Sequence, residues 1–172
     1  MDASVRREQI LNMIGRCESP VSASSLAKTL NVSRQVIVGD IALLRAQGHE
    51  IIATARGYMV PAFKELHQYL GKVACRHTSE DTKDELYTIV DLGAVVVNVI
   101  VEHEIYGEIT GSLNLTGKKD VDLFMNQVAS SEVKLLSALT MGVHLHTIAC
   151  RDKAHFEQVC KALETKGYLF QD

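Results

Sequence analysis

The segment from Ser22 to Tyr58 limits what this chain can fold into more than any other stretch. Its apolar residues keep helical spacing in two short runs, and a turn at Asn31-Val32 separates these runs. Two short helices joined by such a turn can place the second helix in the major groove of DNA. The segment therefore predicts a DNA-binding regulator.

A helix is predicted on each side of Pro20. The first is expected over residues 4–16, and the second begins near Ser22 or Ser24, either of which can accept a backbone N–H as a cap. Ile10, Met13, Ile14 and Cys17 keep helical spacing in the first helix, and the inner stripe expected for the second consists of Leu26, Ala27 and Leu30.

The third predicted helix covers residues 34–47, with Ser33 as its cap. Gly48 suits the position just after a helix, where a left-handed backbone is common. The residues expected on its buried side are Val36, Ile37, Ile41, Leu44 and, at the edge, Ala46.

Two short strands are predicted after this helix, over residues 50–53 and 58–60. The turn between them carries Arg56 at its tip, so the hairpin forms a wing, and Pro61 closes it. The segment SRQVIVGDIALLRAQGHEI resembles the winged helix-turn-helix of biotin repressors and many small-effector regulators. We therefore expect residues 1–61 to form a DNA-binding domain.

Five side chains of this domain are expected to contact DNA. Ser33, Arg34 and Gln35 stand where the third helix would enter the groove, so Arg34 suits guanine or a phosphate and Gln35 suits adenine. Arg45 and Arg56 suit phosphates better than bases. The alternative for each is a solvated surface residue.

Charge differs between the two parts of the chain. Residues 1–61 hold seven Lys/Arg and five Asp/Glu, whereas residues 62–172 hold eleven and sixteen. A basic part beside an acidic part fits one DNA-contacting domain and one that does not contact DNA. No apolar run is long enough to span a membrane, and the first nineteen residues lack the apolar core of a signal peptide. The four scattered cysteines and the lack of an export signal predict a cytoplasmic protein with reduced thiols.

Residues 62–172 predict an α+β domain of the split βαβ type. After a linking helix over 62–70, the expected order is strand, helix, strand, strand, helix, strand and helix. The strands are expected over 72–77, 94–101, 107–115 and 143–149. The helices are expected from a cap at Ser79 or Asp81 through Leu92, and over 118–129 and 153–166.

Three histidines in this domain are placed unusually. His144 and His146 are two residues apart on one strand, so both rings project from the same face. His77 ends the first strand, which can lie beside the fourth in this topology, and Glu85 lies at the edge of the buried stripe of the following helix. Three imidazoles and a carboxylate suit Zn²⁺, Ni²⁺ or Fe²⁺. The alternative is a set of ordinary polar residues.

Nearly the whole chain resembles the nicotinate-responsive transcription repressors that carry a carboxy-terminal three-histidine domain. The matching segments are RHTSEDTKDELYTIVDLG, YGEITGSLNL, DVDLF and MGVHLHTI. This resemblance implies a nickel or zinc ion held by His77, Glu85, His144 and His146. It also implies a homodimer that binds operator DNA and represses genes of niacin uptake or NAD synthesis, with nicotinic acid as co-repressor.

Three other functions remain open at this point. The protein is a metal-sensing regulator if the ion itself is the signal, a metalloenzyme if the ion activates water, or a simple dimer if its second domain serves only for assembly. No dedicated base accompanies the metal candidates, so we expect a protein that is not an enzyme. Cys75 and Cys150 share strand parity with the histidines and are either extra soft ligands or, more simply, small buried residues.

Overall fold

The computed structural model describes residues 2–61 and 69–171. The chain forms two compact units, Met1–Ala62 and Phe63–Asp172, each with its own hydrophobic core. Helices and antiparallel strands occur together, so the α+β fold class is as predicted.

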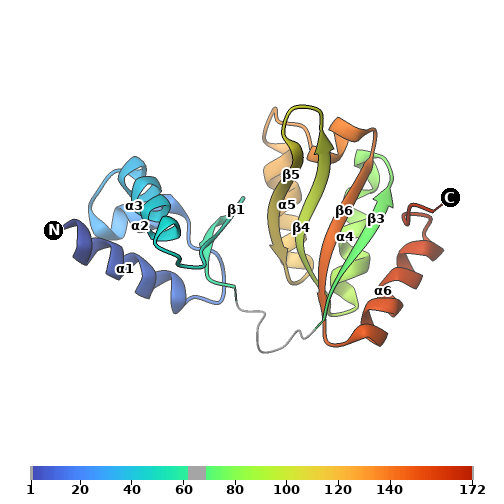
Figure 1. Ribbon diagram of the computed structural model, residues 1–172, viewed down its shortest axis with the longest axis horizontal. Coiled ribbons are helices and arrows are strands. Elements are labelled where there is room, and N and C mark those ends of the chain that lie inside the picture. Colours follow the sequence, from blue (N-terminus) through green and yellow to red (C-terminus); the bar gives the residue numbers. More distant parts are fainter. Residues whose placement is uncertain (1, 62–68, 172) are drawn as a thin grey trace. The chain divides into compact units, whose positions relative to one another are not determined.

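Three helices and a hairpin make up the first unit (Figure 1). The helices are α1 (Ala3–Gly15), α2 (Ala23–Leu30) and α3 (Arg34–Ala46), and the hairpin pairs β1 (Ile52–Thr54) with β2 (Gly57–Met59) in antiparallel register. This is the winged helix-turn-helix predicted from the sequence.

Local capping explains where these helices begin and end. Ser22, rather than Ser24, caps α2, because its Oγ accepts a hydrogen bond from the backbone N–H of Ser25 at 3.1 Å. The Oγ of Ser33 accepts from the N–H of Val36 at 3.3 Å at the start of α3. Gly48 follows α3 with φ +93°, as expected of a glycine that closes a helix.

The buried side of α3 differs from the predicted one at two positions. Ile37, Ile41 and Leu44 are buried, but Val36 is 37% exposed and Ala46 is also exposed. Val36 lies one residue before Ile37, which turns it about 100° away from the core around the helix axis. Sequence reasoning missed Asp40, which is buried and forms an ion pair with Arg6 of α1. Oδ2 of Asp40 lies 2.6 Å from Nε of Arg6.

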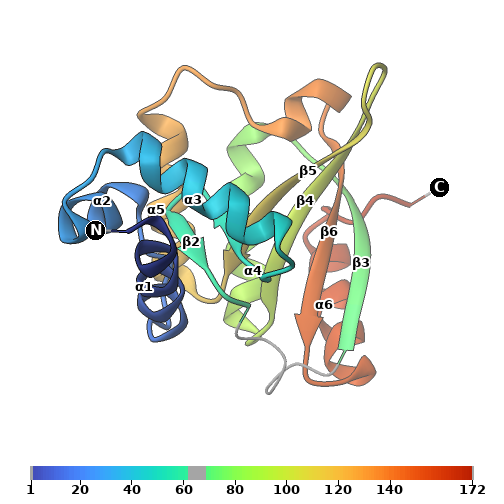
Figure 2. The same ribbon diagram turned by 60° about the vertical axis from the view of Figure 1, so that its left-hand side comes forward.

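The second unit is a four-stranded antiparallel sheet covered on one face by three helices (Figures 1 and 2). The strands are β3 (Tyr69–Arg76), β4 (Val95–His103), β5 (Gly107–Leu115) and β6 (Val143–Cys150). The α-helices are α4 (Thr82–Asp91), α5 (Lys118–Ala129) and α6 (Lys153–Thr165), and the short 3₁₀ turns are η1 (Ser79–Asp81) and η2 (Leu136–Thr140).

Strand order in this sheet is β3-β6-β4-β5, so the last strand lies between the first two. This is the split arrangement predicted from the sequence, and it sets β6 directly against β3. Cys75 of β3 pairs with His144 of β6, and Val73 pairs with His146. All four side chains therefore face the helix-covered side of the sheet.

Two predictions for this unit need correction. Residues 62–68 of the predicted linking helix lie outside the described residues, but Tyr69 and Leu70, its last two, begin β3 instead. Asp81 stands at the start of α4 without making a side-chain cap. Its carboxylate accepts a hydrogen bond from the Thr78 hydroxyl at 3.0 Å, because η1 turns the chain before α4 begins. None of the helices in the described part of the chain has both the length and the apolar character needed to cross a bilayer.

Candidate metal centre and nucleic-acid interface

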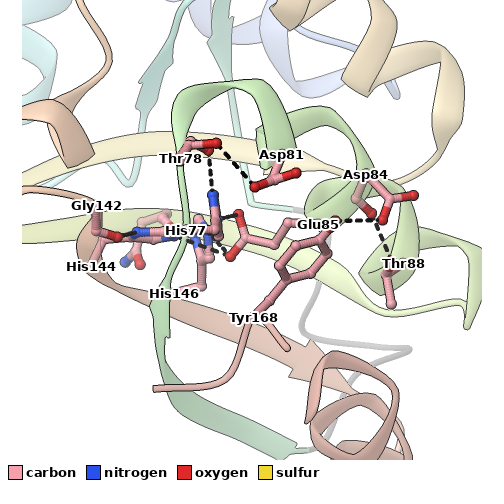
Figure 3. Close-up of polar contacts among 11 residues, drawn as sticks. His77, Thr78, Asp81, Asp84, Glu85, Thr88, Gly142, His144, His146 and Tyr168 are labelled. Atoms are coloured by element: carbon pink, nitrogen blue, oxygen red, sulfur yellow. Dashed lines mark hydrogen bonds and ion pairs between the residues drawn. The ribbon is translucent and has the colours of Figure 1, made fainter. Parts of the chain in front are cut away.

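The three predicted histidines lie together on the helix-covered side of the sheet (Figure 3). His77 follows β3, whereas His144 and His146 project from β6. The ring centroid of His144 is 4.9 Å from that of His77 and 4.8 Å from that of His146. All three side chains are at most 4% exposed, so the cluster is shielded from bulk water.

Glu85 of α4 points into the middle of this cluster and is fully buried (Figure 3). Its Oε2 is 2.6 Å from Nε2 of His77, and its Oε1 is 3.1 Å from Nε2 of His144 and 3.3 Å from Nε2 of His146. The structure thus brings the four predicted donors to one point, with the carboxylate at the centre.

The other ring nitrogen of each histidine is fixed by the backbone. Nδ1 of His77 lies 2.8 Å from the carbonyl oxygen of Thr78, Nδ1 of His144 lies 2.8 Å from that of Gly142, and Nδ1 of His146 lies 2.7 Å from that of Asn98. A carbonyl oxygen can only accept, so each Nδ1 carries the hydrogen and donates it. In the neutral rings Nε2 therefore presents a lone pair toward Glu85, which is how proteins prepare histidines to bind metals.

The charges of the cluster depend on one another. Burial alone would raise the pKa of Glu85, but the imidazoles of His146, His144 and His77 outweigh burial and hold that pKa well below its usual range. Burial would lower the pKa of His146 and of His77, and the Glu85 carboxylate raises both above the ordinary value. The site therefore favours positive charge among its imidazoles.

A divalent cation fits this donor set. Among the described residues, Nε2 of His77, Nε2 of His146 and Oε2 of Glu85 are buried without a hydrogen-bond partner, since the close contacts between them lack hydrogen-bond geometry. Lone pairs that converge in a buried space repel one another unless a proton or a cation lies between them. Imidazole nitrogen and carboxylate oxygen are the donors that Zn²⁺, Ni²⁺ and Fe²⁺ accept.

Gly142 holds the loop before β6 against the end of β3. Its φ is +92°, and a Cβ atom at this position would lie 2.3 Å from the carbonyl oxygen of His77. Its own carbonyl oxygen accepts the hydrogen bond from His144. Only glycine allows this close approach, so Gly142 positions two of the three imidazoles.

A narrow cavity adjoins the cluster. His77, Glu85, His144 and His146 line one side, and the apolar wall consists of Leu86, Val99, Leu113, Phe124, Leu135 and Leu136. Thr82 and Ser137 add two hydroxyl groups, and the Thr82 Oγ1 is buried with no hydrogen-bond partner among the described residues. An open hollow lies outside, where Arg76, His77 and Ser137 are among the lining residues.

The DNA candidates fall into two places in the first unit. Arg34, at the start of α3, and Arg56, at the tip of the wing, line one hollow together with Ser22 and Ser24 at the start of α2. Ser33 and Gln35 are exposed at the same end of α3. Arg45 is exposed in the last turn of α3, about 16 Å further along the helix, and is not part of this hollow.

Comparison with known proteins agrees with both halves of this architecture. A family model described as an HTH domain matches residues 6–59, and a model described as the 3H domain matches residues 71–172. Transcription repressor NadR of Bacillus subtilis (strain 168) is 43% identical over 169 residues, which cover 97% of this chain and 94% of that protein. Probable transcription repressor NiaR of Thermotoga maritima is 41% identical over 167 residues, with the same two shares.

The chain belongs to the 3H-domain transcription repressors.

This 3H repressor is a DNA-binding regulator rather than an enzyme, as the sequence predicted. Sequence reasoning missed several residues that build its candidate metal centre. Gly142 and Asn98 act through backbone carbonyls, which leave no mark in side-chain patterns. Thr82 lies one turn before Leu86 on the buried face of α4, so helical spacing alone would have placed it inward.

Proposed function

We propose that this 3H repressor controls genes of niacin uptake or NAD synthesis, with nicotinic acid as its co-repressor. In this proposal His77, Glu85, His144 and His146 hold a divalent ion, Ni²⁺ or Zn²⁺, with Fe²⁺ as a further choice. The main observation behind this proposal is that three imidazoles converge on one buried carboxylate beside an apolar cavity. Nδ1 of each ring donates to a backbone carbonyl, which leaves the Nε2 lone pair to bind an ion. The ion would offer its remaining coordination positions to the carboxylate or the pyridine nitrogen of the ligand.

The side chains that line the cavity suit a pyridine carboxylate. Phe124 and the surrounding leucines suit a flat ring. The Thr82 hydroxyl has no hydrogen-bond partner among the described residues and can donate to an acceptor on the ligand. Arg76 in the outer hollow suits a carboxylate during entry, because a guanidinium is planar and permanently charged. A neutral amide would lack this attraction.

Ligand entry requires a change in the covering segment. Leu136 and Ser137 of η2 line the inner cavity, and Ser137 also lines the outer hollow. The inner cavity has a volume of about 30 Å³, which is too small for a six-membered ring, so we infer that η2 moves outward as the ligand enters. Because η2 packs against β4 and β6, occupancy of the cavity would be transmitted to the centre of the sheet.

On DNA, we propose that a homodimer sets two α3 helices into successive major grooves, ~34 Å apart for half-sites one turn apart. Ser33, Arg34 and Gln35 would contact bases or nearby phosphates, and Arg45 and Arg56 would contact phosphates. The protein would act in the cytoplasm, where its operator lies. Nicotinate can favour the DNA-competent dimer only by the difference in its affinity for the two states.

Operator binding with and without nicotinate tests the proposal. Wild-type protein loaded with Zn²⁺ or Ni²⁺ is expected to bind operator DNA more tightly when nicotinate is present. The double variant His144→Ala/His146→Ala should lose this dependence while retaining weak binding to DNA. Nicotinate-dependent binding that persists in the double variant would remove the metal from the mechanism.

The donor cluster also favours a second function, in which the ion itself is the signal. A metal-sensing repressor would bind its operator in proportion to the metal concentration with no nicotinate present. A titration of operator affinity against free Zn²⁺ and Ni²⁺ in nicotinate-free buffer distinguishes the two functions.

A further inference from the structure

Cys75 lies next to the candidate metal centre but belongs to neither the predicted ligand set nor the apolar wall of the cavity. It is fully buried on β3, two residues before His77 and directly opposite His144 in the sheet. Its side chain therefore faces the same side as the three imidazoles.

The sulfur forms a compact triangle with two of the predicted ligands. One ligand atom each from Cys75, Glu85 and His144 lies within 4.8 Å of the other two. An ion about 2.3 Å from sulfur and about 2.0–2.2 Å from nitrogen and oxygen keeps its donors within about 4.5 Å of one another. The triangle therefore needs little adjustment to hold an ion that Glu85 and His144 also bind.

We propose that Cys75 is a ligand of the metal ion, so that the site is a sulfur-containing one. The inference rests on the proposed function, because it requires that the histidine cluster holds an ion. When sulfur binds, the S–H bond breaks, a metal–sulfur bond forms and the proton leaves to solvent. A thiolate donor favours borderline and soft ions over Mg²⁺ and Mn²⁺, so Cys75 determines which ions the repressor accepts.

Another buried cysteine provides a control within the same chain. Cys150 is also buried and lies on β6, in the strand that carries His144 and His146, but it is not part of the triangle. Cys150→Ser therefore removes a buried thiol from the same sheet without touching the proposed ligand set. Cys75→Ser replaces sulfur with a smaller and harder donor at the same backbone position.

Co²⁺ is the probe, because its electronic spectrum distinguishes thiolate from imidazole and carboxylate ligands. The full-length protein loaded with Co²⁺ is expected to show visible d–d bands and a near-ultraviolet sulfur-to-cobalt charge-transfer band. Cys75→Ser should lose the charge-transfer band and keep the d–d bands, whereas Cys150→Ser should keep both. In competition with a chelator, Cys75→Ser should bind Zn²⁺ more weakly than wild type by at least about 10- to 100-fold, the cost of losing even an outer-shell partner.

A Co²⁺-loaded wild-type protein with d–d bands and no charge-transfer band would overturn the Cys75 proposal and leave the histidine site intact. A charge-transfer band that survives in Cys75→Ser would also overturn it. The absence of every cobalt band in wild type would instead overturn the metal centre itself. The charge-transfer band of the wild-type protein tests sulfur ligation even if Cys75→Ser fails to fold.

Discussion

Oε1 of Glu85 lies 3.1 Å from Nε2 of His144, although the two residues are 59 positions apart in the chain. This closeness follows from the strand order of the second unit. β6 is inserted between β3 and β4, so the histidines of the last strand come under α4, the helix that joins the first two strands. A simple meander with four strands in chain order would hold β6 away from β3.

Glu85 is central to the cluster, so Glu85→Gln should weaken ion binding more than the same kind of replacement at any nearby acidic residue. The amide lacks the negative charge that offsets the ion, and we expect an affinity for Zn²⁺ at least about 10- to 100-fold lower. Metal analysis of the purified protein and chelator competition measure the effect. Asp84→Asn is the matched control, because Asp84 is the preceding residue, is about half exposed and contacts Lys166 and Tyr168 instead. Equal ion contents in the two variants would contradict the assignment.

Gly142→Ala should destabilise the second unit and weaken ion binding together. The left-handed backbone costs an alanine about 1–2 kcal/mol, and the clash with the His77 carbonyl oxygen adds about 1–3 kcal/mol. Gly93→Ala separates these effects, since Gly93 has φ +81° but a Cβ there would meet no atom of the described residues within 4 Å. Urea unfolding, followed by circular dichroism, should show a smaller loss in the free energy of unfolding for Gly93→Ala than for Gly142→Ala. The ion affinity of Gly93→Ala should be unchanged. A loss of similar size in both variants would show that the close approach is unimportant.

Thr82→Val is expected to leave stability unchanged or raise it, because it removes a buried hydroxyl that has no partner in the described structure. Under the proposed function, the same change should weaken nicotinate binding about 10- to 100-fold. This corresponds to the loss of one hydrogen bond to a charged group, which contributes about 1.5–3 kcal/mol. Calorimetric titration of metal-loaded protein with nicotinate measures the loss. Thr88→Val on the same helix is the control, because its hydroxyl donates to the Asp84 carbonyl oxygen at 2.7 Å and does not line the cavity. Unaltered nicotinate affinity in Thr82→Val would exclude this contact.

Arg34→Ala tests how the first unit contacts DNA. If Arg34 contacts a base, the loss should be ~1–3 kcal/mol on operator DNA and much smaller on scrambled DNA. A phosphate contact would instead weaken binding to both DNAs alike and reduce the salt dependence of binding. Titrations of both DNAs at several salt concentrations decide between these outcomes. Arg45→Ala, at the far end of α3, is expected to act on both DNAs equally. No effect of Arg34→Ala on either DNA would make Arg34 an ordinary surface residue.

The sequence predicted most of what depends on local pattern. The bounds of β5 and α5 agree with the expected ones. The alternating pattern runs from Gly107 to Leu115, and the helical spacing of α5 ends at Ala129. The gathering of His77 and Glu85 with the histidines of β6 followed from the split topology and from family resemblance, not from spacing.

Features that arise from tertiary contacts were not predictable. Asp40 is buried because Arg6 of another helix reaches it, and no pattern within α3 indicates that partner. The cavity beside the histidines depends on where η2 crosses the sheet. The clash that would follow a side chain at Gly142 depends on a backbone oxygen 65 residues away, at His77, since the two segments meet only in the folded chain.

Strand pairing in the second unit also has a consequence for how the repressor can respond. Alternate residues of β6 face opposite sides, so a slip of one residue against β3 would turn both His144 and His146 away from Glu85. The register of β6 against β3 thus decides whether the proposed ligands face one another. Under the proposed function, a bound ion would link β3, β6 and α4 in this register, so its loss would act on an inner strand of the sheet and not on an edge strand.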